Sequence, residues 1–295
     1  MRANRMLAQS AMEYLMTYGW AILIIAVVLG ALFQLGVFNA GTFSPRAPPG
    51  ACQVFRPNGP ESTSFLNLEG VCSGELPQYT GVFTFGGSDY VDVANSVQIN
   101  FGAGSFTIGV WAKATYVDSS YGWQRILAKR GSGAVNWYSI ALQSTSQTPI
   151  LELGGIEPAA TGPIQLNKWY YIVGKRNGTS GVASIYVNGD LNASVSGATQ
   201  NTDNSGDLQI GCWGGGQCWG GNIANLQIYN TSLSSNEIQY LYSEGIGGAP
   251  VNLEYLVGWW PLNGNANDYS GDNINGVPNG GMTYTNQWVS GYTPP

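Results

Sequence analysis

Two tryptophans and two cysteines lie close together in the segment Gly-Cys-Trp-Gly-Gly-Gly-Gln-Cys-Trp, residues 211–219. An exposed indole face can stack on a sugar ring, so Trp213 and Trp219 are the candidate glycan-binding residues of this chain. The glycine-rich stretch around them predicts a loop, and loops commonly carry binding residues. The alternative is that both indoles pack in the core, where tryptophan is usually found.

Oxygen-rich turns occur at residues 268–273 and around Asp89. Calcium takes roughly six to eight oxygen ligands, so Asp268, Asp272 and Asp89 are the candidate ligands of a structural calcium ion. The alternative is that these side chains accept hydrogen bonds from nearby backbone groups, as aspartate does in turns. Ligand number cannot be counted from spacing, and both interpretations stay open.

Groups that could catalyse a reaction are sparse. The chain has no histidine, which excludes Ser–His and Cys–His nucleophilic catalysis and imidazole metal sites. Glycoside hydrolysis needs two carboxyl groups that flank the scissile bond, but no Glu-x-Asp-x-x-Glu pattern occurs, and Glu152 and Glu157 are isolated. We therefore predict no catalytic residues, and a polysaccharide-degrading enzyme is the least favoured alternative.

The amino-acid composition excludes further classes of function. Only 9% of the residues are charged and the net charge is −6, which argues against nucleic-acid binding through phosphate neutralisation. Because 44% of the residues are hydrophobic and 12% are aromatic, the chain can bury a large core, and its low charge does not indicate disorder.

Residues 1–40 differ from the rest of the chain. Residues 1–8 are basic, and no charged residue occurs from Tyr14 to Pro45. A helix over residues 9–40, at about 1.5 Å per residue, is long enough to span a bilayer. A secretory signal and a plain membrane anchor are two interpretations of this segment.

A third interpretation depends on Glu13, which lies at the head of the apolar stretch and is expensive in lipid unless it is paired. Cleavage between Ala8 and Gln9 would free an α-amino group on Gln9, which could neutralise Glu13 of a neighbouring subunit. The basic leader, the run Gln-Ser-Ala-Met-Glu-Tyr-Leu and the uncharged helix resemble the class III signal and N-terminal helix of archaeal type IV pilins and archaellins.

The pilin resemblance implies an assembly route. A prepilin peptidase would remove residues 1–8 from a subunit held in the cell membrane. Residues 9–40, with Gln9 and Glu13 as assembly residues, would then pack into a homopolymeric filament at the cell surface. A non-polymerising membrane anchor is the alternative, and it needs neither the carboxylate nor the cleavage site.

Residues 41–80 are rich in Pro, Gly and Ser and form a predicted linker. The linker contains Cys52 and Cys72, and with Cys212 and Cys218 the four cysteines allow three pairings. The sequence-local pairing, 52–72 and 212–218, is the simplest, and export would let disulfides persist. A four-thiolate zinc site is the alternative, but the spacing it needs does not occur.

From residue 81 onward, apolar residues recur at every second position. Runs such as 106–112 and 169–173 predict strands, and Asn188-Gly189 predicts a two-residue hairpin turn. About ten such short strands indicate a β-sandwich. Ser234 and Glu237 have the spacing of a capping box, which predicts that a helix begins there.

This domain resembles the laminin-G-like, concanavalin-A-like jelly-roll family. The matching segments are 83–93, 106–114, 126–133, 169–173, 183–191 and 222–238. Residues 258–277 match the segment that normally opens that family's domain. We therefore predict a circular permutation in which residues 251–295 complete a head of residues 81–295. The start of a second domain is the alternative.

The resemblance implies a mainly β fold, a laminin-G-like sandwich preceded by one long hydrophobic helix. It also implies glycan binding by loops and, in many members, a structural calcium ion. The sequence thus predicts a pilin-like cell-surface filament subunit whose lectin-like head serves adhesion. The alternative is a non-polymerising, membrane-anchored carbohydrate-binding protein.

The sequons at Asn177, Asn192 and Asn230 are candidate glycosylation sites of an exported head. Chance occurrence is the alternative in a chain rich in Asn and Ser. Peptide mass spectrometry distinguishes the two.

Overall fold

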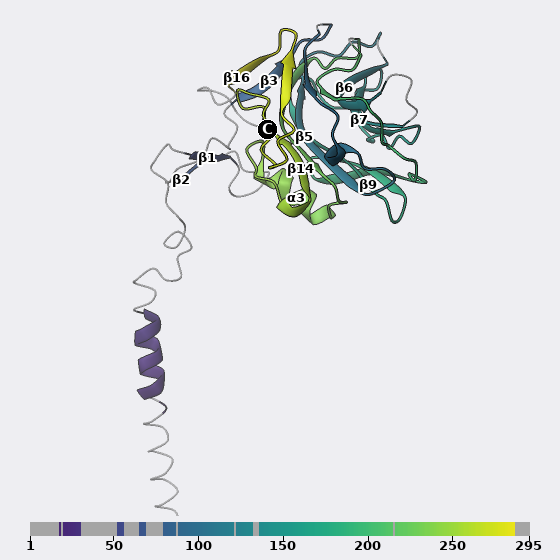
Figure 1. The fold of residues 1–295 in the computed structure, drawn as a ribbon. Helices are drawn as coiled ribbons and strands as arrows, with labels where there is room; N and C mark the ends of the chain where they lie inside the picture. Colours follow the sequence, from purple (N-terminus) through teal and green to yellow (C-terminus); the bar gives the residue numbers. More distant parts are fainter. Residues whose placement is uncertain are drawn as a thin grey trace, which may run out of the picture.

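The computed structural model describes residues 18, 20–30, 52–55, 65–68, 79–86, 88–120, 122–131, 136–214 and 216–286. Most of these residues form a β-sandwich of two antiparallel sheets, drawn in Figure 1. Apart from the sandwich, residues 20–30 are helical, and Cys52–Phe55 (β1) pairs with Phe65–Leu68 (β2). The predicted mainly β sandwich is confirmed.

The larger sheet contains eight strands of the described chain, in the order β11-β10-β9-β5-β13-β3-β16, with β14 paired to β13. Their bounds are β3 Tyr79–Phe83, β5 Phe106–Ala114, β9 Trp169–Asn177, β10 Val182–Val187, β11 Asp190–Ser196, β13 Gly221–Tyr229, β14 Leu256–Trp260 and β16 Thr283–Asn286. The β10–β11 turn is the predicted one, because Asn188 and Gly189 take φ values of 54° and 85°.

The smaller sheet contains six strands of the described chain, in the order β15-β4-β12-β6-β7-β8. Their bounds are β4 Tyr90–Val93, β6 Trp123–Arg130, β7 Trp137–Gln143, β8 Thr148–Leu153, β12 Leu208–Ile210 and β15 Gly276–Asn279. One register row crosses all six strands through Val277, Asp92, Gln209, Ala128, Ser139 and Glu152. Side chains alternate along strands, so this row lies on the outer face, opposite core residues such as Tyr138.

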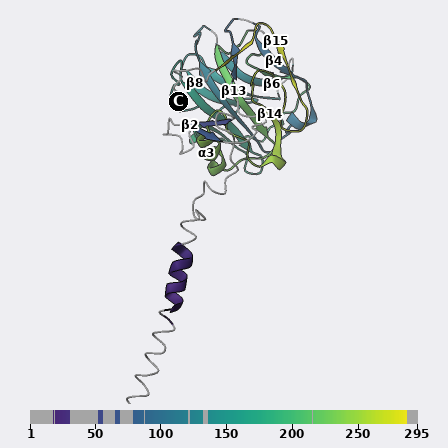
Figure 2. The same cartoon turned by 90° about the vertical axis from the view of Figure 1, so that its left-hand side faces the viewer.

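The C-terminal part of the chain supplies strands to both sheets. β14 pairs with β13, and β16 lies beside β3 in the larger sheet (Figure 1). β15 pairs with β4 in the smaller sheet (Figure 2). Trp260 of β14 is fully buried in the core between the sheets. Strands from residues 251–286 thus belong to the same sandwich, residues 287–295 lie outside the described part, and the circular permutation stays a prediction.

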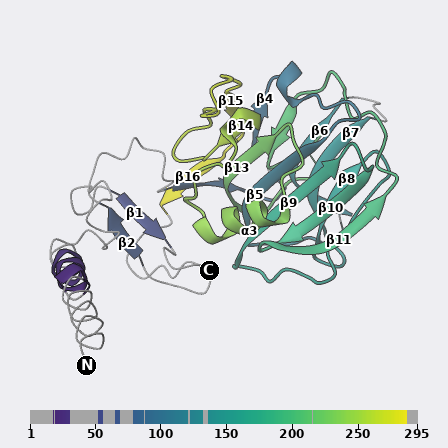
Figure 3. The same ribbon diagram turned by 90° about the horizontal axis from the view of Figure 1, so that it is seen from below.

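The helix α3, Ser235–Glu244, begins at the predicted capping box, in which Ser234 and Glu237 bind each other's backbone N–H groups. It covers the outer face of the larger sheet near β5 and β9, as Figure 3 shows. There the ring centroids of Tyr242 and Trp111 are 5.8 Å apart. The larger sheet is therefore covered on both faces in this region, by the smaller sheet and by α3. Two short 3-10 helices lie at Val97–Ile99 and Leu253–Tyr255.

The predicted helix over residues 9–40 is described only at Tyr18 and residues 20–30, which are helical and exposed. Within the described residues, no helix is long and apolar enough to cross a membrane. The structure thus supports a short helical segment, and the long helix is not shown.

Several predictions fall on residues that the structure does not describe. The leader of residues 1–8, the cleavage site at Ala8 and Gln9, and Glu13 lie outside the described residues. The Cys52–Cys72 pairing also lies outside them, because Cys72 and the side chain of Cys52 are not described.

Candidate functional site

A row of alternating indole and guanidinium groups lies on the outer face of the smaller sheet. The guanidinium carbon of Arg125 is 5.7 Å from the ring centroid of Trp123 and 5.6 Å from that of Trp137. The guanidinium carbon of Arg130 is 4.7 Å from the Trp137 centroid and 4.6 Å from that of Trp213. These five side chains come from β6, β7 and the loop after β12, and we call them the tryptophan–arginine ladder.

A β-bulge in β6 brings the ladder to one face. The register with β7 shifts between Arg125 and Leu127, and both Ile126 and Leu127 are buried in the core. One extra residue reverses the alternation of a strand, so Arg125 shares the outer face with Arg130 instead of pointing inward. Arg130 then lies directly opposite Trp137 in the register.

The disulfide between Cys212 and Cys218 closes the loop that carries Trp213, which confirms this predicted pairing. The loop begins at Gly211, whose φ of 90° lies in the left-handed region. A Cβ at this position would collide with the ring of Phe83. Glycine is therefore the residue that fits where the chain enters the loop.

Hydrogen bonds hold the disulfide loop against β6. The backbone N–H of Arg125 donates to the Gln217 carbonyl at 3.1 Å, and Arg125 Nε donates to Gln217 Oε1 at 2.9 Å. Trp213 Nε1 donates to the Arg130 carbonyl at 3.4 Å. These bonds place the indole of Trp213 over the guanidinium of Arg130 before any ligand arrives.

The two guanidinium groups differ in their partners. Arg125 Nη1 donates to Ser139 Oγ at 2.9 Å. Arg125 also forms an ion pair with Glu152, and the two paired side chains are 3% and 2% exposed, respectively. Burial and, second, the charge of Arg130 lower the pKa of Arg125 to about 10. Arg130 is half-buried, and within the described chain no carboxylate pairs with its guanidinium. The ladder therefore carries an uncompensated positive charge at Arg130.

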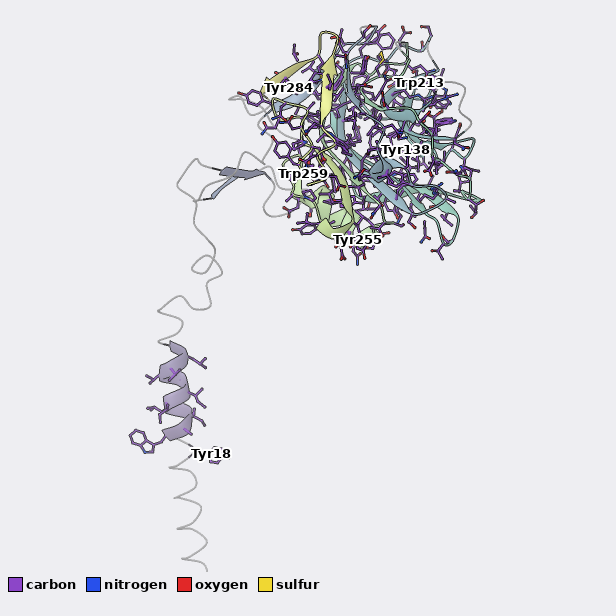
Figure 4. The ribbon with its side chains drawn as sticks, viewed as in Figure 1. Tyr18, Tyr138, Trp213, Tyr255, Trp259 and Tyr284 are labelled. Atoms are coloured by element: carbon purple, nitrogen blue, oxygen red, sulfur yellow. A yellow bond between two sulfur atoms is a disulfide. The ribbon has the colours of Figure 1, made fainter. Side chains whose placement is uncertain are left out.

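The structure separates the two predicted glycan-binding tryptophans. Trp213 is half-buried and lies on the side of the sandwich where β6 and β7 run (Figure 4). Trp219 is fully buried in the core, and its Nε1 donates to the Asn222 carbonyl at 3.3 Å. A side chain with no exposed surface cannot stack on a sugar, so Trp219 packs the core and Trp213 is the candidate that remains.

The predicted calcium ligands have other partners. Asp268 Oδ1 accepts the Trp259 and Ser270 N–H groups at 2.9 Å each, and Oδ2 accepts Ser270 Oγ and the Ile274 N–H. Those bonds occupy the Asp268 oxygens and favour the turn-residue alternative.

The other two predicted calcium ligands, Asp89 and Asp272, do not form a metal-coordination site with Asp268 among the described residues. Asp89 accepts the N–H groups of Thr84 and Gly281 at 3.0 Å and 2.7 Å, and Asp272 is exposed. Within the described residues, no three acidic, cysteine or histidine side chains gather as a metal site. Calcium stays a prediction, and the proposals below do not depend on it.

The sequon asparagines lie on the surface of the sandwich. Asn177 Oδ1 accepts the N–H groups of Thr179 and Ser180 at the turn after β9. Asn192 is half-buried in β11, and Asn230 is exposed after β13. Glycosylation of these residues stays a prediction.

The sequence reasoning missed Arg125 and Arg130. One signal was available: Trp123 and Arg125 are two residues apart, which places them on one face of a strand. The stacking of Trp213 on Arg130 had no such signal, because the disulfide loop and β6 are far apart in the chain.

This chain matches one family profile, one relative and several solved structures. The profile described as the concanavalin A-like lectin/glucanases superfamily matches residues 85–239, which include every residue of the ladder. Human pentraxin-related protein PTX3 is 32% identical over 175 residues, covering 52% of this chain and 42% of the human protein. The chain thus spans less than half the length of that relative.

Two solved structures share the fold. A protein of Bacteroides ovatus proposed to bind carbohydrate superposes with a TM-score of 0.57 at 18% identity, covering 76% of this chain and 63% of that one. The SAP-like pentraxin of Limulus polyphemus superposes with a TM-score of 0.52 at 14% identity. The match covers 71% of this chain and 95% of the pentraxin chain. At these identities the structures show the fold alone.

Proposed function

Because the chain belongs to the concanavalin A-like lectin/glucanases superfamily, we propose that its sandwich binds carbohydrate through the tryptophan–arginine ladder. The observation that carries the proposal is a set of three half-buried indoles, Trp123, Trp137 and Trp213, along one face. An aromatic ring supplies large apolar contact area at a low cost in side-chain entropy. The shared fold with a protein proposed to bind carbohydrate supports this function.

The ladder is preorganised for binding. Trp137 lies on β7, and the loop of Trp213 is closed by a disulfide and bonded to β6. The guanidinium groups between the rings also restrict how each indole can turn. A ligand therefore binds without first ordering these side chains, and less free energy is lost on binding.

Binding without catalysis is the form of the function that we favour. Glu152 is the outer-face carboxylate of β8, and it is buried in its ion pair with Arg125. A glycosidase needs one carboxylic acid and one carboxylate that both reach the scissile bond. A paired and buried Glu152 supplies neither role.

A glycan array probed with the full chain tests the proposal. We expect Trp213→Ala to weaken binding about tenfold or more, since lost stacking of about 1.4 kcal/mol corresponds to that factor. The matched control is Trp20→Ala, which removes an indole that is 66% exposed on the helical segment 20–30. An array without bound glycans, or a Trp213→Ala variant that binds like the wild type, would contradict the proposal.

Display outside the cell is a further part of the proposed function. The Cys212–Cys218 disulfide supports an oxidising compartment. Pilin-like assembly through Gln9 and Glu13 is a finer hypothesis about residues that the structure does not describe. The N-terminus of the mature protein tests it: Gln9 supports processing and assembly, whereas Met1 favours an uncut membrane anchor.

A further inference from the structure

The geometry points to an acidic glycan as the ligand, with the guanidinium of Arg130 binding a carboxylate of the sugar. This inference rests on the proposed function of the ladder and adds the chemical class of the ligand. It is carried by the stacking of Arg130, by the absence of an ion-paired carboxylate at Arg130 among the described residues, and by the contrast with Arg125.

Two indole rings lie close to the Arg130 guanidinium. Its carbon lies over the ring of Trp137 at 4.7 Å and over the ring of Trp213 at 4.6 Å. A guanidinium is planar, and its N–H donors lie along its edge, where they form a rigid fork. That fork matches a planar carboxylate through two parallel hydrogen bonds.

The donors of Arg130 have no acceptor within the described chain that would neutralise the charge, since the buried ion pair of this face belongs to Arg125 and Glu152. Residues 132–135, which the structure does not describe, are Ser, Gly, Ala and Val. The loop that follows β6 therefore contains no carboxylate. Among the described residues, no carboxylate is ion-paired with Arg130, so its guanidinium is a candidate site for a negative group of a ligand.

Arg125 shows what a structural arginine on this face looks like. Its Nε donates to Gln217, its Nη1 donates to Ser139, and its charge is balanced by Glu152. Arg130 lies close enough to lower the pKa of Arg125, so the two positive charges repel each other. An anion bound at Arg130 would relieve that repulsion, and a neutral sugar would not.

The position of Arg130 suits a sugar that carries its charge beside the ring. The rings of Trp137 and Trp213 both lie next to the guanidinium. A uronic or sialic acid bears a carboxylate directly on the pyranose ring, so one residue of the glycan can meet the arginine edge and a neighbouring indole together. Charge-assisted hydrogen bonds to the carboxylate are stronger than those to hydroxyl groups.

Calorimetric titration of the full chain tests this inference with matched ligands. The panel pairs tetragalacturonate with its methyl ester, and sialyllactose with lactose. We expect at least one acid to bind about tenfold or more tightly than its neutral counterpart, which corresponds to about 1.4 kcal/mol. A keratan sulfate oligosaccharide, which has sulfate and no uronic acid, distinguishes sulfate from carboxylate recognition.

Two variants distinguish the effect of the planar N–H donors of Arg130 from the effect of positive charge alone. Arg130→Lys retains the positive charge and loses the planar donors, so we expect about tenfold weaker binding of the acid and little change for the neutral sugar. Lys168→Gln is the control, because Lys168 is exposed beside β9 of the other sheet. Thermal unfolding checks that both variants remain folded.

Each outcome has a defined meaning. Equal affinity for the acid and its neutral counterpart overturns the acidic ligand and leaves carbohydrate binding intact. Equal losses in Arg130→Lys and Lys168→Gln overturn the role of Arg130, as does tighter binding of keratan sulfate than of every carboxylate. If the wild type binds no member of the panel or of the glycan array, the proposed function itself fails, and this inference fails with it.

Discussion

The outer faces of the two sheets both carry tryptophans, but what lies over them differs. On the larger sheet, Trp111, Trp169 and Trp259 are 1%, 2% and 8% exposed beneath α3 and the segments next to it. On the smaller sheet, the tryptophans of the ladder are half-buried and alternate with Arg125 and Arg130. Residue type alone therefore does not distinguish an aromatic core from an aromatic binding face.

Several polar atoms of the covered face bond to one another, although Trp169 Nε1 and the Tyr171 hydroxyl have no hydrogen-bond partner among the described residues. Trp259 Nε1 donates to Asn225 Oδ1 at 2.8 Å, and the hydroxyl of Tyr229 donates to Gln227 Oε1 at 2.7 Å. On the ladder, by contrast, the Arg130 guanidinium keeps donors for an external acceptor. The comparison predicts that substitutions on the covered face lower stability, and that substitutions on the ladder mainly lower affinity.

The largest expected effect is on the covered face. Trp111→Ala removes an indole packed against Tyr171 and Tyr242, and we expect it to lower the free energy of unfolding by about 3–5 kcal/mol in urea denaturation. Trp137→Ala on the ladder is the matched substitution, with an expected loss of about 1 kcal/mol from its cation–π contacts. Equal losses in the two variants would remove the distinction between the faces.

Glu152→Gln has the next largest effect, because it leaves the buried guanidinium of Arg125 without its counter-charge. Breaking a buried ion pair from one side costs about 3 kcal/mol or more. Chemical denaturation measures the loss, and Glu254→Gln at an exposed position provides the control, with an expected change below about 0.5 kcal/mol. A loss below about 1 kcal/mol would show that Arg125 does not depend on Glu152.

Replacing both Cys212 and Cys218 by serine has a smaller effect on stability than Glu152→Gln, and it has a separate effect on binding. Opening this short loop should cost about 2 kcal/mol in urea denaturation, by the loop-closure estimate. Affinity should also fall, since Trp213 is no longer held over Arg130. Glycan titration of the same preparation measures this, and unchanged affinity would mean that hydrogen bonds alone position the indole.

Local patterns in the sequence were enough to predict much of the fold. Alternating apolar residues predicted the strands, Asn188-Gly189 predicted the β10–β11 turn, and Ser234 with Glu237 predicted the start of α3. Each of these signals acts over a few neighbouring residues, where backbone dihedral angles and short hydrogen bonds decide the outcome. The Cys212–Cys218 pair is local in the same sense.

Which side chains reach solvent was decided by the tertiary structure. The bulge after Arg125 turned that residue outward, core packing buried Trp219, and backbone N–H groups occupied Asp268. The burial of Trp219 depends on core residues from distant parts of the chain, whereas the bonds to Asp268 come from residues two to nine positions away. A tryptophan in a loop therefore indicates that aromatic surface is present, but whether that surface is covered depends on the element that the fold places over it.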